Sequence, residues 1–217
     1  MSQMELFAED GISAPEDAFG AAEDLSALFE RSVDAYYAVV HARMSCLPIK
    51  KEIDRFIEKV SRAGGRAAAD KTASDRGDGD VLAVLKAADK VRVEIHRLIG
   101  LLRFTADPSG VYVARCAPDY FILPALAEHF TLRFGETPWA IIDEKRKLCL
   151  RRGQSSPARL TPSQDAPAPA AGKEAGDSWE ELWRLYHRSI NNETRNNPRL
   201  QRQFMPERYQ KYLPEMD

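Results

Sequence analysis

Hydrophobic residues recur at steps of three or four through residues 23–44, which is the spacing of one helix face. The same spacing returns over residues 49–62, after Pro48. The two stretches therefore predict an N-terminal helical region, residues 23–62, made of two amphipathic helices. The apolar positions are Leu25, Leu28, Phe29, Val33, Tyr36, Tyr37 and Val40 in the first, and Ile49, Ile53, Phe56, Ile57 and Val60 in the second.

The two segments on either side of this region lack the helical spacing of hydrophobic residues. Residues 1–22 are acidic and rich in Ala and Gly, so they are expected to form a mobile acidic tail. Residues 63–80 are punctuated by Gly and Asp, which predicts a loop or linker. Helical periodicity resumes over 81–99, and Gly100 is typical of a helix end.

The pattern changes beyond residue 100. "LLRFTADPSGVYVARC" has two short apolar runs around a Pro-Ser-Gly turn, which predicts a β-hairpin. "PDYFILPALAEHFTLRFG" has helical spacing up to Gly135, with Pro124 marking either the start of the helix or a kink. "WAIIDEKRKLCLRR" predicts a second hairpin with a charged turn at 143–147. Residues 81–152 thus read as an α+β core, a small, mainly antiparallel sheet packed with N-terminal and C-terminal helices.

The last third of the chain begins with a non-periodic stretch. Residues 153–177 are rich in Pro, Ala, Gly and Ser, which predicts a flexible linker. "SWEELWRLYHRSI" then predicts a helix over 178–190, with Ser178 at the N-cap and an apolar stripe that includes Trp179 and Trp183. Residues 178–217 are expected to be this helix and a basic, aromatic tail that packs on the core.

Composition narrows the class of protein. The chain has 217 residues, 44% hydrophobic and 29% charged, as in a soluble globular protein. No apolar run approaches the roughly 20 residues that span a bilayer. The first thirty residues hold eight acidic side chains and no Lys or Arg, unlike a signal peptide, so a cytoplasmic location is predicted. The three cysteines show no metal or disulfide spacing, and neither a metal nor a cofactor is expected.

The charge is unevenly distributed. Residues 195–213 carry five Lys or Arg and one Glu, although the whole chain has a net charge of −2. Lys and Arg neutralise phosphates, and aromatic rings stack on unpaired bases. Tyr209 and Tyr212 are the candidate rings. The candidate nucleic-acid ligands in this tail are Arg199, Arg202, Arg208 and Lys211.

An alternative interpretation of the tail is structural. Its apolar residues would pack the segment onto the core and leave the cations in solvent, which does not exclude phosphate binding by some of the arginines. These apolar residues are Leu200, Phe204, Met205, Tyr209 and Tyr212.

Arg103 and Arg115 belong to the first predicted hairpin. Strand alternation would send both side chains to one sheet face, where they would hold nucleic acid or a partner. The alternative is that they are ordinary solvated cations.

Candidate catalytic residues are few. His96, Asp119 and His129 would form an acid–base site only if the fold brings them together, because a neutral His can act as a general base. No catalytic partner lies at a diagnostic spacing, and no glycosylase, phosphate-loop, paired-carboxylate or zinc-deaminase motif occurs. Structural hydrogen bonds are the alternative role for His96 and His129.

Two blocks carry a family resemblance. They are "EIHRLIGLLRF" continuing through "VYVARCAPDYFILPALAEHFTLRF" to "WAIIDEKRKLCL", and "ELWRLYHRSI" followed by "NPRLQRQFMPERYQKYLPE". Over residues 81–150 and 178–215 the chain resembles the DUF4130 family, described as a probable DNA metabolism protein. Residues 1–80 match that family poorly, and Tyr120 stands where the family often has His.

The resemblance implies a pathway more than a reaction. Members of the family accompany a radical SAM protein thought to modify or repair DNA, and similar domains are fused to uracil-DNA glycosylase-like domains. This chain has no three-cysteine cluster motif, so it would be a companion of the radical SAM enzyme.

The N-terminus carries a second resemblance. "QMELF", with Gln3, Leu6 and Phe7, is similar to the peptide by which bacterial DNA-repair proteins dock on the replication sliding clamp. The alternatives are a tail without function or a local anchor that packs on the body.

Three hypotheses follow. The first is an accessory protein of bacterial DNA metabolism or repair that binds nucleic acid, a radical SAM partner, or both. The second is an enzyme acting on a damaged or modified nucleotide. The third is a protein-binding subunit without nucleic-acid contact, which predicts an exposed apolar patch on the Trp179/Trp183 helix or the first helix.

Overall fold

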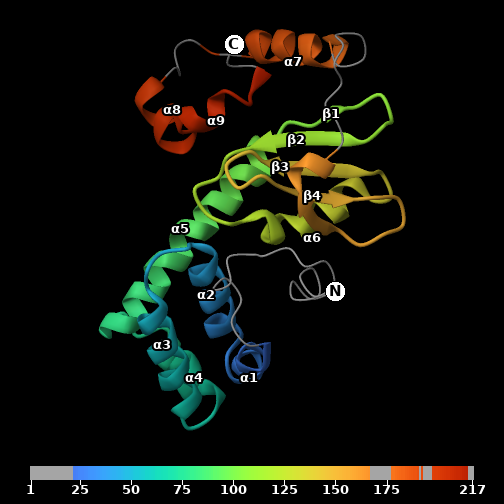
Figure 1. Ribbon diagram of the computed structural model, residues 1–217. Coiled ribbons are helices and arrows are strands. Elements are labelled where there is room, and N and C mark those ends of the chain that lie inside the picture. The colour runs from blue at the N-terminus through green and yellow to red at the C-terminus, as the bar shows by residue number, and fades with distance from the viewer. Residues whose placement is uncertain (1–21, 167–176, 191, 193–196, 215–217) are drawn as a thin grey trace. The chain divides into compact units, whose positions relative to one another are not determined.

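The computed structural model describes residues 22–166, 177–190, 192 and 197–214 (Figure 1). These residues form two compact units. The helical unit comprises described residues from 22 to 95 together with 119–122, and the sheet unit comprises 96–118 and the described residues from 123 onward. The acidic tail predicted at 1–22 lies outside the described residues except for its last position.

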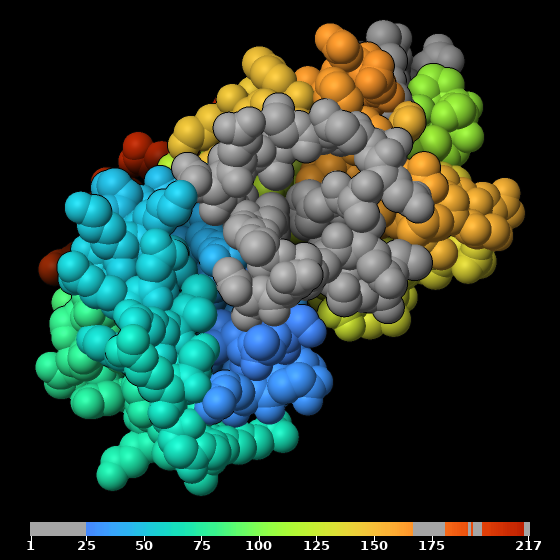
Figure 2. All heavy atoms as spheres, turned by 60° about the horizontal axis from the view of Figure 1, so that its bottom comes forward, coloured from blue at the N-terminus to red at the C-terminus, as the bar shows by residue number. Residues whose placement is uncertain are grey.

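The helical unit contains α1 (Ala22–Arg31), α2 (Val33–Met44), α3 (Lys50–Arg62), α4 (Arg66–Ala73) and the first part of α5 (Gly79–Leu101). The surfaces of α3 and α4 adjoin in Figure 2, where both are cyan. Apolar side chains from every helix make the core, as the helical spacing predicts. The core includes Leu25, Leu28, Val39, Met44, Phe56, Val60, Ala69, Val84 and Val91, each at most 1% exposed.

The predicted helix over 23–44 is in fact two helices. Ser32 interrupts it with an extended backbone, φ −158° and ψ 114°. Its hydroxyl oxygen accepts a hydrogen bond from Ala35 N at 3.2 Å, so Ser32 caps the start of α2. Serine is a favoured N-cap because its side chain satisfies an amide that the first helical turn leaves unpaired.

The prediction of a loop at 63–80 is wrong for most of that segment. α4 occupies residues 66–73, with Ala69 and Ala73 buried. Because most of its side chains are small, the sequence shows little hydrophobic periodicity there. α5 begins at Gly79, where the Asp78 carboxylate accepts from Val81 N at 3.1 Å. Lys59 binds the same carboxylate at 2.6 Å. The Gly and Asp residues thus mark helix ends.

A buried carboxylate orders residues 119–122, which also belong to the helical unit. Glu94 of α5 is 2% exposed and accepts hydrogen bonds from the backbone amides of Asp119 and Tyr120, both at 2.8 Å. Phe121, fully buried, adds a backbone hydrogen bond to Met44 O at 3.0 Å. A carboxylate that accepts two amides in a buried place forms charge-assisted bonds, which are stronger than neutral ones.

The sheet unit has five strands in the order β1-β2-β3-β4-β5. The strands are β1 (Thr105–Ala106), β2 (Tyr112–Cys116), β3 (Trp139–Asp143), β4 (Leu148–Arg152) and β5 (Arg159–Pro162). Both predicted hairpins are present as the antiparallel pairs β1/β2 and β3/β4, and β4/β5 is also antiparallel. The α+β class is confirmed. The parallel pairing of β2 with β3 was not predicted.

α6 (Leu123–Phe134) is the crossover between the two parallel strands and packs against β3 and β4 (Figure 1). It begins beside Pro124, which settles the choice between a start and a kink, since proline suits the first helical turn. Phe130 is fully buried and lies 6.1 Å from the Trp139 ring of β3.

The predicted linker at 153–177 is wrong for residues 159–165, whereas residues 153–158 form no helix or strand. Residues 159–162 form β5, and a 3₁₀ turn covers Ser163–Asp165. Leu160 is 3% exposed and pairs with Leu150 of β4, so strand pairing and burial outweigh the Pro- and Ser-rich composition. Residues 167–176 lie outside the described part.

Three helices follow in the sheet unit: α7 (Asp177–Ile190), α8 (Pro198–Phe204) and α9 (Glu207–Gln210). α7 begins one residue before Ser178, the predicted N-cap. No helix among the described residues is both long and apolar enough to cross a membrane.

All three cysteines are free thiols. Cys46 is exposed, whereas Cys116 and Cys149 are buried in the sheet. Burial raises the pKa of the Cys149 thiol to about 11.

We expect Glu94→Gln to destabilise the protein by about 2 kcal/mol, because one of the two amides would then face an NH₂ group in a buried place. Urea unfolding, followed by far-ultraviolet circular dichroism, measures the change. Asp54→Asn, at an exposed position of α3, is the matched control and should shift the free energy of unfolding by less than about 0.5 kcal/mol. Equal effects of the two substitutions would contradict the role given to Glu94.

Candidate nucleic-acid interface

The candidate site begins where the parallel strands end. In β2 and β3, Arg115 lies opposite Ile142 and Cys116 opposite Asp143, so both strands finish at the same edge. Arg115 and Glu144 continue the alternation of the sheet face that carries Val113 and Ile142. In open α/β sheets, ligands commonly bind beyond the carboxyl ends of parallel strands, and β2 and β3 form such a parallel pair within this mainly antiparallel sheet.

Glu144 is the centre of this edge. Its Oε2 accepts a hydrogen bond from the Tyr212 hydroxyl at 2.7 Å and lies 3.6 Å from Lys211 Nζ. Its Oε1 accepts from Arg115 at 3.2 Å. The backbone N of Glu144 donates to Cys116 O at 2.9 Å, which fixes the carboxylate relative to both strands. We call Arg115, Glu144, Lys211 and Tyr212 the carboxyl-end cluster.

The ionisation of the cluster follows from these contacts. The hydrogen bond from Tyr212 holds the pKa of Glu144 below its usual value, against the opposite effect of burial, and Arg115 and Lys211 act in the same direction. Burial, and then the bond to Glu144, raises the pKa of Tyr212 well above its ordinary value. At neutral pH the cluster therefore holds a carboxylate, a protonated phenol and two cations, with a net charge of +1.

Buried tail residues add to this attachment. Tyr209 and Leu213 are each 1% exposed, so the apolar side of α9 is covered. The Arg208 guanidinium lies over the Tyr209 ring, 4.7 Å from its centre, and Lys211 Nζ lies 4.5 Å from the centre of the Tyr212 ring. Both cations belong to exposed residues. Residues 207–213 are thus docked through their rings, and their cations remain accessible.

α8 presents two further cations. Asn197 caps the helix by accepting from Leu200 N at 3.0 Å, and Arg97 of α5 donates to Gln203 O at 3.1 Å. Arg199 and Arg202 lie three positions apart on one face, and both are exposed. Arg202 Nε donates to Pro198 O at 3.3 Å within the same helix.

The tail therefore combines both interpretations of the sequence. The prediction that Tyr209 packs on the core is confirmed. Its burial excludes the stacking role that was the other prediction for this ring. The prediction that Leu200 and Phe204 also pack on the core is wrong, because these side chains are 48% and 63% exposed. Phe204 is therefore an accessible ring, although the amphipathic pattern predicted that it packs.

Arg103 does not lie on a strand. It precedes β1, donates to Gly100 O at 2.9 Å and sits 5.6 Å from the centre of the Trp183 ring of α7. The prediction that strand alternation places it on one sheet face with Arg115 is wrong, because the alternation begins only at Thr105. Arg103 attaches α7 to the end of α5.

The three candidate catalytic residues have different surroundings. His96 and Asp119 are exposed. His129 is half-buried, with its ring 4.9 Å from that of Phe130. The backbone amide of Asp119 donates to Glu94, so its position has a structural explanation.

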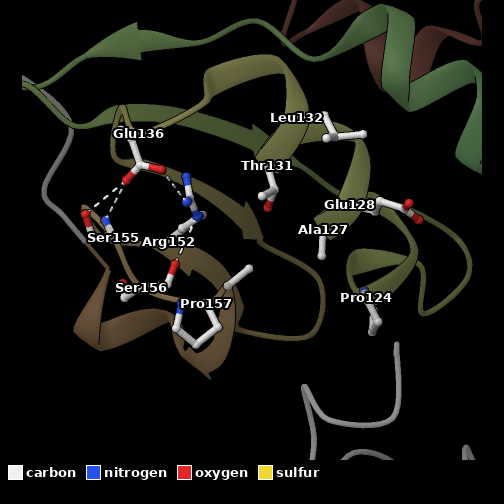
Figure 3. Close-up of a pocket in the computed structure, with 11 residues that line it drawn as sticks. Pro124, Ala127, Glu128, Thr131, Leu132, Glu136, Arg152, Ser155, Ser156 and Pro157 are labelled. Atoms are coloured by element: carbon white, nitrogen blue, oxygen red, sulfur yellow. Dashed lines mark hydrogen bonds and ion pairs between the residues drawn. The ribbon is translucent and has the colours of Figure 1, made fainter. Parts of the chain in front are cut away.

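One cavity of about 630 Å³ lies between α6 and residues 152–158 (Figure 3). Glu136, Arg152 and Ser155 gather at one end of it, and Pro124 and Glu128 lie at the other. Glu136 accepts from Ser155 N and Oγ at 3.1 and 3.0 Å, and Arg152 donates to Ser156 O at 2.9 Å. These groups satisfy one another and tie the β4–β5 connection to the turn that follows α6. His129 does not line this cavity.

Two further expectations concern the sliding-clamp peptide and a metal site. Gln3, Leu6 and Phe7, the sliding-clamp candidates, lie outside the described residues. Within the described part of the chain, no group of three His, Cys, Asp or Glu side chains is arranged to hold a metal ion.

The fold and this surface define an α+β protein with a docked, basic C-terminal segment at the carboxyl end of a parallel strand pair. The chain belongs to the DUF4130 family, a domain of unknown function, whose family model matches residues 51–215. No curated protein and no solved structure matches the chain. The match begins at α3, so the expectation that residues 1–80 match the family poorly is wrong from residue 51 onward.

We expect Tyr212→Phe to loosen α9, because it removes the hydroxyl that donates to Glu144. Amide hydrogen exchange over residues 205–214 should become roughly fivefold faster, the effect of losing about 1 kcal/mol from a partly exposed hydrogen bond. Tyr37→Phe, at an exposed tyrosine of the helical unit, is the control and should leave exchange in this segment unchanged. Unchanged exchange in Tyr212→Phe would show that the bond does not hold the tail.

The raised pKa of Tyr212 gives a separate test. An undocked tyrosine ionises near pH 10, while the docked one resists ionisation. Docking of the wild-type tail should therefore weaken as pH rises above about 10, and Tyr212→Phe should lack that dependence. Exchange rates corrected for intrinsic pH effects provide the measurement, and a parallel pH dependence in both proteins would contradict the assignment.

Proposed function

We propose that this protein is an accessory protein of DNA metabolism or repair that binds single-stranded DNA through its C-terminal segment. The binding surface, here called the basic tail surface, consists of Arg199, Arg202, Phe204, Arg208 and Lys211. The observation that carries the proposal is that all four cations are exposed while Tyr209 and Leu213 anchor the segment. Four cations accompany a single acid, Glu207, over residues 199–211.

Anchoring of the C-terminal segment favours phosphate binding by its cations. A cation on a mobile chain loses conformational freedom when it holds a phosphate, and an anchored segment has already lost most of it. Exposed Phe204 adds a ring on which an unpaired base can stack. Exposed cations on an anchored segment that also carries an accessible ring favour a single strand over a duplex, whose bases are already stacked.

Glu144 divides the cations into two groups. Lys211 and Arg115 share its charge, whereas Arg199 and Arg202 lie on α8. Partly exposed ion pairs contribute only about 0–1 kcal/mol, so a phosphate can displace Glu144 from Lys211. Arg199 and Arg202 are therefore expected to contribute more to binding than Lys211.

The family resemblance supports a partner as well as a ligand. The resemblance implies that a radical SAM enzyme thought to act on DNA is the companion, and a protein that holds a single strand would present substrate to that enzyme. We include this partner in the proposal, and co-purification from cells that express both proteins tests it.

We expect wild-type protein to bind a labelled 20-nucleotide single strand with strong salt dependence. Four phosphate contacts predict a slope of about −3 in a plot of log K against log salt concentration. The variant Arg199→Ala/Arg202→Ala/Arg208→Ala/Lys211→Ala should lose at least tenfold in affinity at low salt and show a much flatter slope. Fluorescence anisotropy across a salt series makes the measurement, with a matched duplex and RNA strand alongside.

A second quadruple variant separates the surface from net charge. Lys51, Arg66, Lys71 and Lys86 are exposed residues of the helical unit, and replacing all four with Ala removes the same charge. This control should keep wild-type affinity. Equal losses in the two variants, or no binding of any strand by wild-type protein at low salt, would overturn the proposal.

Phe204→Ala tests the stacking role. We expect single-strand affinity to fall by about 1 kcal/mol or more, which is about fivefold, while duplex affinity stays constant. Leu200→Ala, a neighbouring exposed side chain without a π-face, is the control. A similar loss on single strand and duplex would remove Phe204 from the base-binding role.

A further inference from the structure

α7 is amphipathic, but its apolar side faces solvent. Leu182, Leu185, Tyr186 and Ile190 are 54%, 58%, 52% and 58% exposed. Surface helices normally turn the apolar stripe toward the core and leave charged residues outside. A helix whose apolar side faces solvent indicates a surface that a partner covers in an assembly.

The opposite side of α7 is the one that contacts the rest of the unit. Arg184 Nε donates to Pro214 O at 2.8 Å, and Trp183 lies under the Arg103 guanidinium. His187 is half-buried one turn further on. At 100° per residue these three positions lie on one side, and Leu182 and Leu185 lie on the other. The attachment of α7 therefore uses Arg184 and Trp183, and its leucines are left accessible.

The accessible side has the pattern of a helix-pairing surface. Leu182, Leu185, Tyr186 and Ser189 follow the i, i+3, i+4, i+7 spacing. Ser189 donates its hydroxyl hydrogen to Tyr186 O at 2.8 Å, so the small side chain is satisfied within the helix and permits close approach of a second helix.

The charges beside this surface complement one another. Glu181 and Arg188 are both exposed and are seven residues apart, so they lie on the same edge of the helix, two turns from each other. Leu185 lies between them along that edge. A second α7 in antiparallel orientation, related by a twofold axis near Leu185, would bring Glu181 of each copy to Arg188 of the other. A parallel pairing would place Glu181 beside Glu181.

We propose that α7 is a homodimer interface, in which the Leu182/Leu185/Ser189 side of one copy pairs in antiparallel orientation with the same side of a second copy. Two identical Glu181–Arg188 pairs flank the apolar contact. The complementarity of the helix with itself identifies a second copy of this chain as the occupant. The proposal is independent of nucleic-acid binding.

The first test is the mass of the full-length protein in solution. Sedimentation equilibrium over a concentration series should show a shift from 24.4 kDa to twice that mass, 48.8 kDa. Leu185→Asp should keep the protein monomeric with unchanged circular dichroism, because it places a charge in the apolar contact. The proposal would be overturned if the wild-type protein remained at 24.4 kDa up to about 100 times the concentration used in the anisotropy measurements. This holds whether or not another protein binds α7.

A charge exchange tests the antiparallel register. Glu181→Arg alone would place Arg beside Arg188 of the second copy, and Arg188→Glu alone would place Glu beside Glu181. Each single variant should dimerise at least tenfold more weakly than wild type.

Mixing the two single variants should restore association, because each copy then offers the charges that the other needs. The mixed species is detected by tagging one variant and capturing the other. Rescue on mixing does not arise from damaged folding, so it separates the interface from a local effect on helix stability. Two weakened variants that fail to rescue each other would overturn the antiparallel arrangement.

Discussion

The carboxylate of Glu144 joins two segments that are 68 residues apart in the chain, and the placement of the C-terminal segment depends on it. A carboxylate at the end of β3 receives a phenol from the tail and a guanidinium from β2. The tail in turn buries Tyr209 and Leu213, so an electrostatic contact and an apolar one act together. Without them α9 would have too few contacts to stay in place, because four residues make little more than one helical turn.

Local sequence patterns predicted those parts of the fold that neighbours in the chain determine. The periods of 3.6 and 2 predicted the regions of α1, α2, α3, α5, α6 and α7 and both hairpins. α4 was missed because alanines carry little periodic contrast, although Ala69 and Ala73 are buried. β5 was missed because its stability comes from β4, and the Pro and Ser residues around it resemble a linker. The parallel contact of β2 with β3 depends on how the crossover helix returns, which no local pattern encodes.

The candidate site was predictable in composition but not in arrangement. Counting charges was enough to single out the four cations of the tail. Which rings are buried was not predictable, since Tyr209 and Phe204 both fit an amphipathic pattern and only tertiary packing separates them. Glu144 was not singled out because its partners Arg115 and Tyr212 are distant in sequence. The misplacement of Arg103 arose from extending strand alternation two residues beyond the strand.

The burial of two thiols and the exposure of a third have a practical consequence. A maleimide reagent added to the native protein would modify Cys46 first, because Cys116 and Cys149 are shielded and the Cys149 thiol resists deprotonation. The number of modified cysteines, counted by mass spectrometry as denaturant rises, would therefore report when the sheet opens. Cys46 itself lies at the end of α2, so a single dye attached there would label the helical unit without an engineered residue.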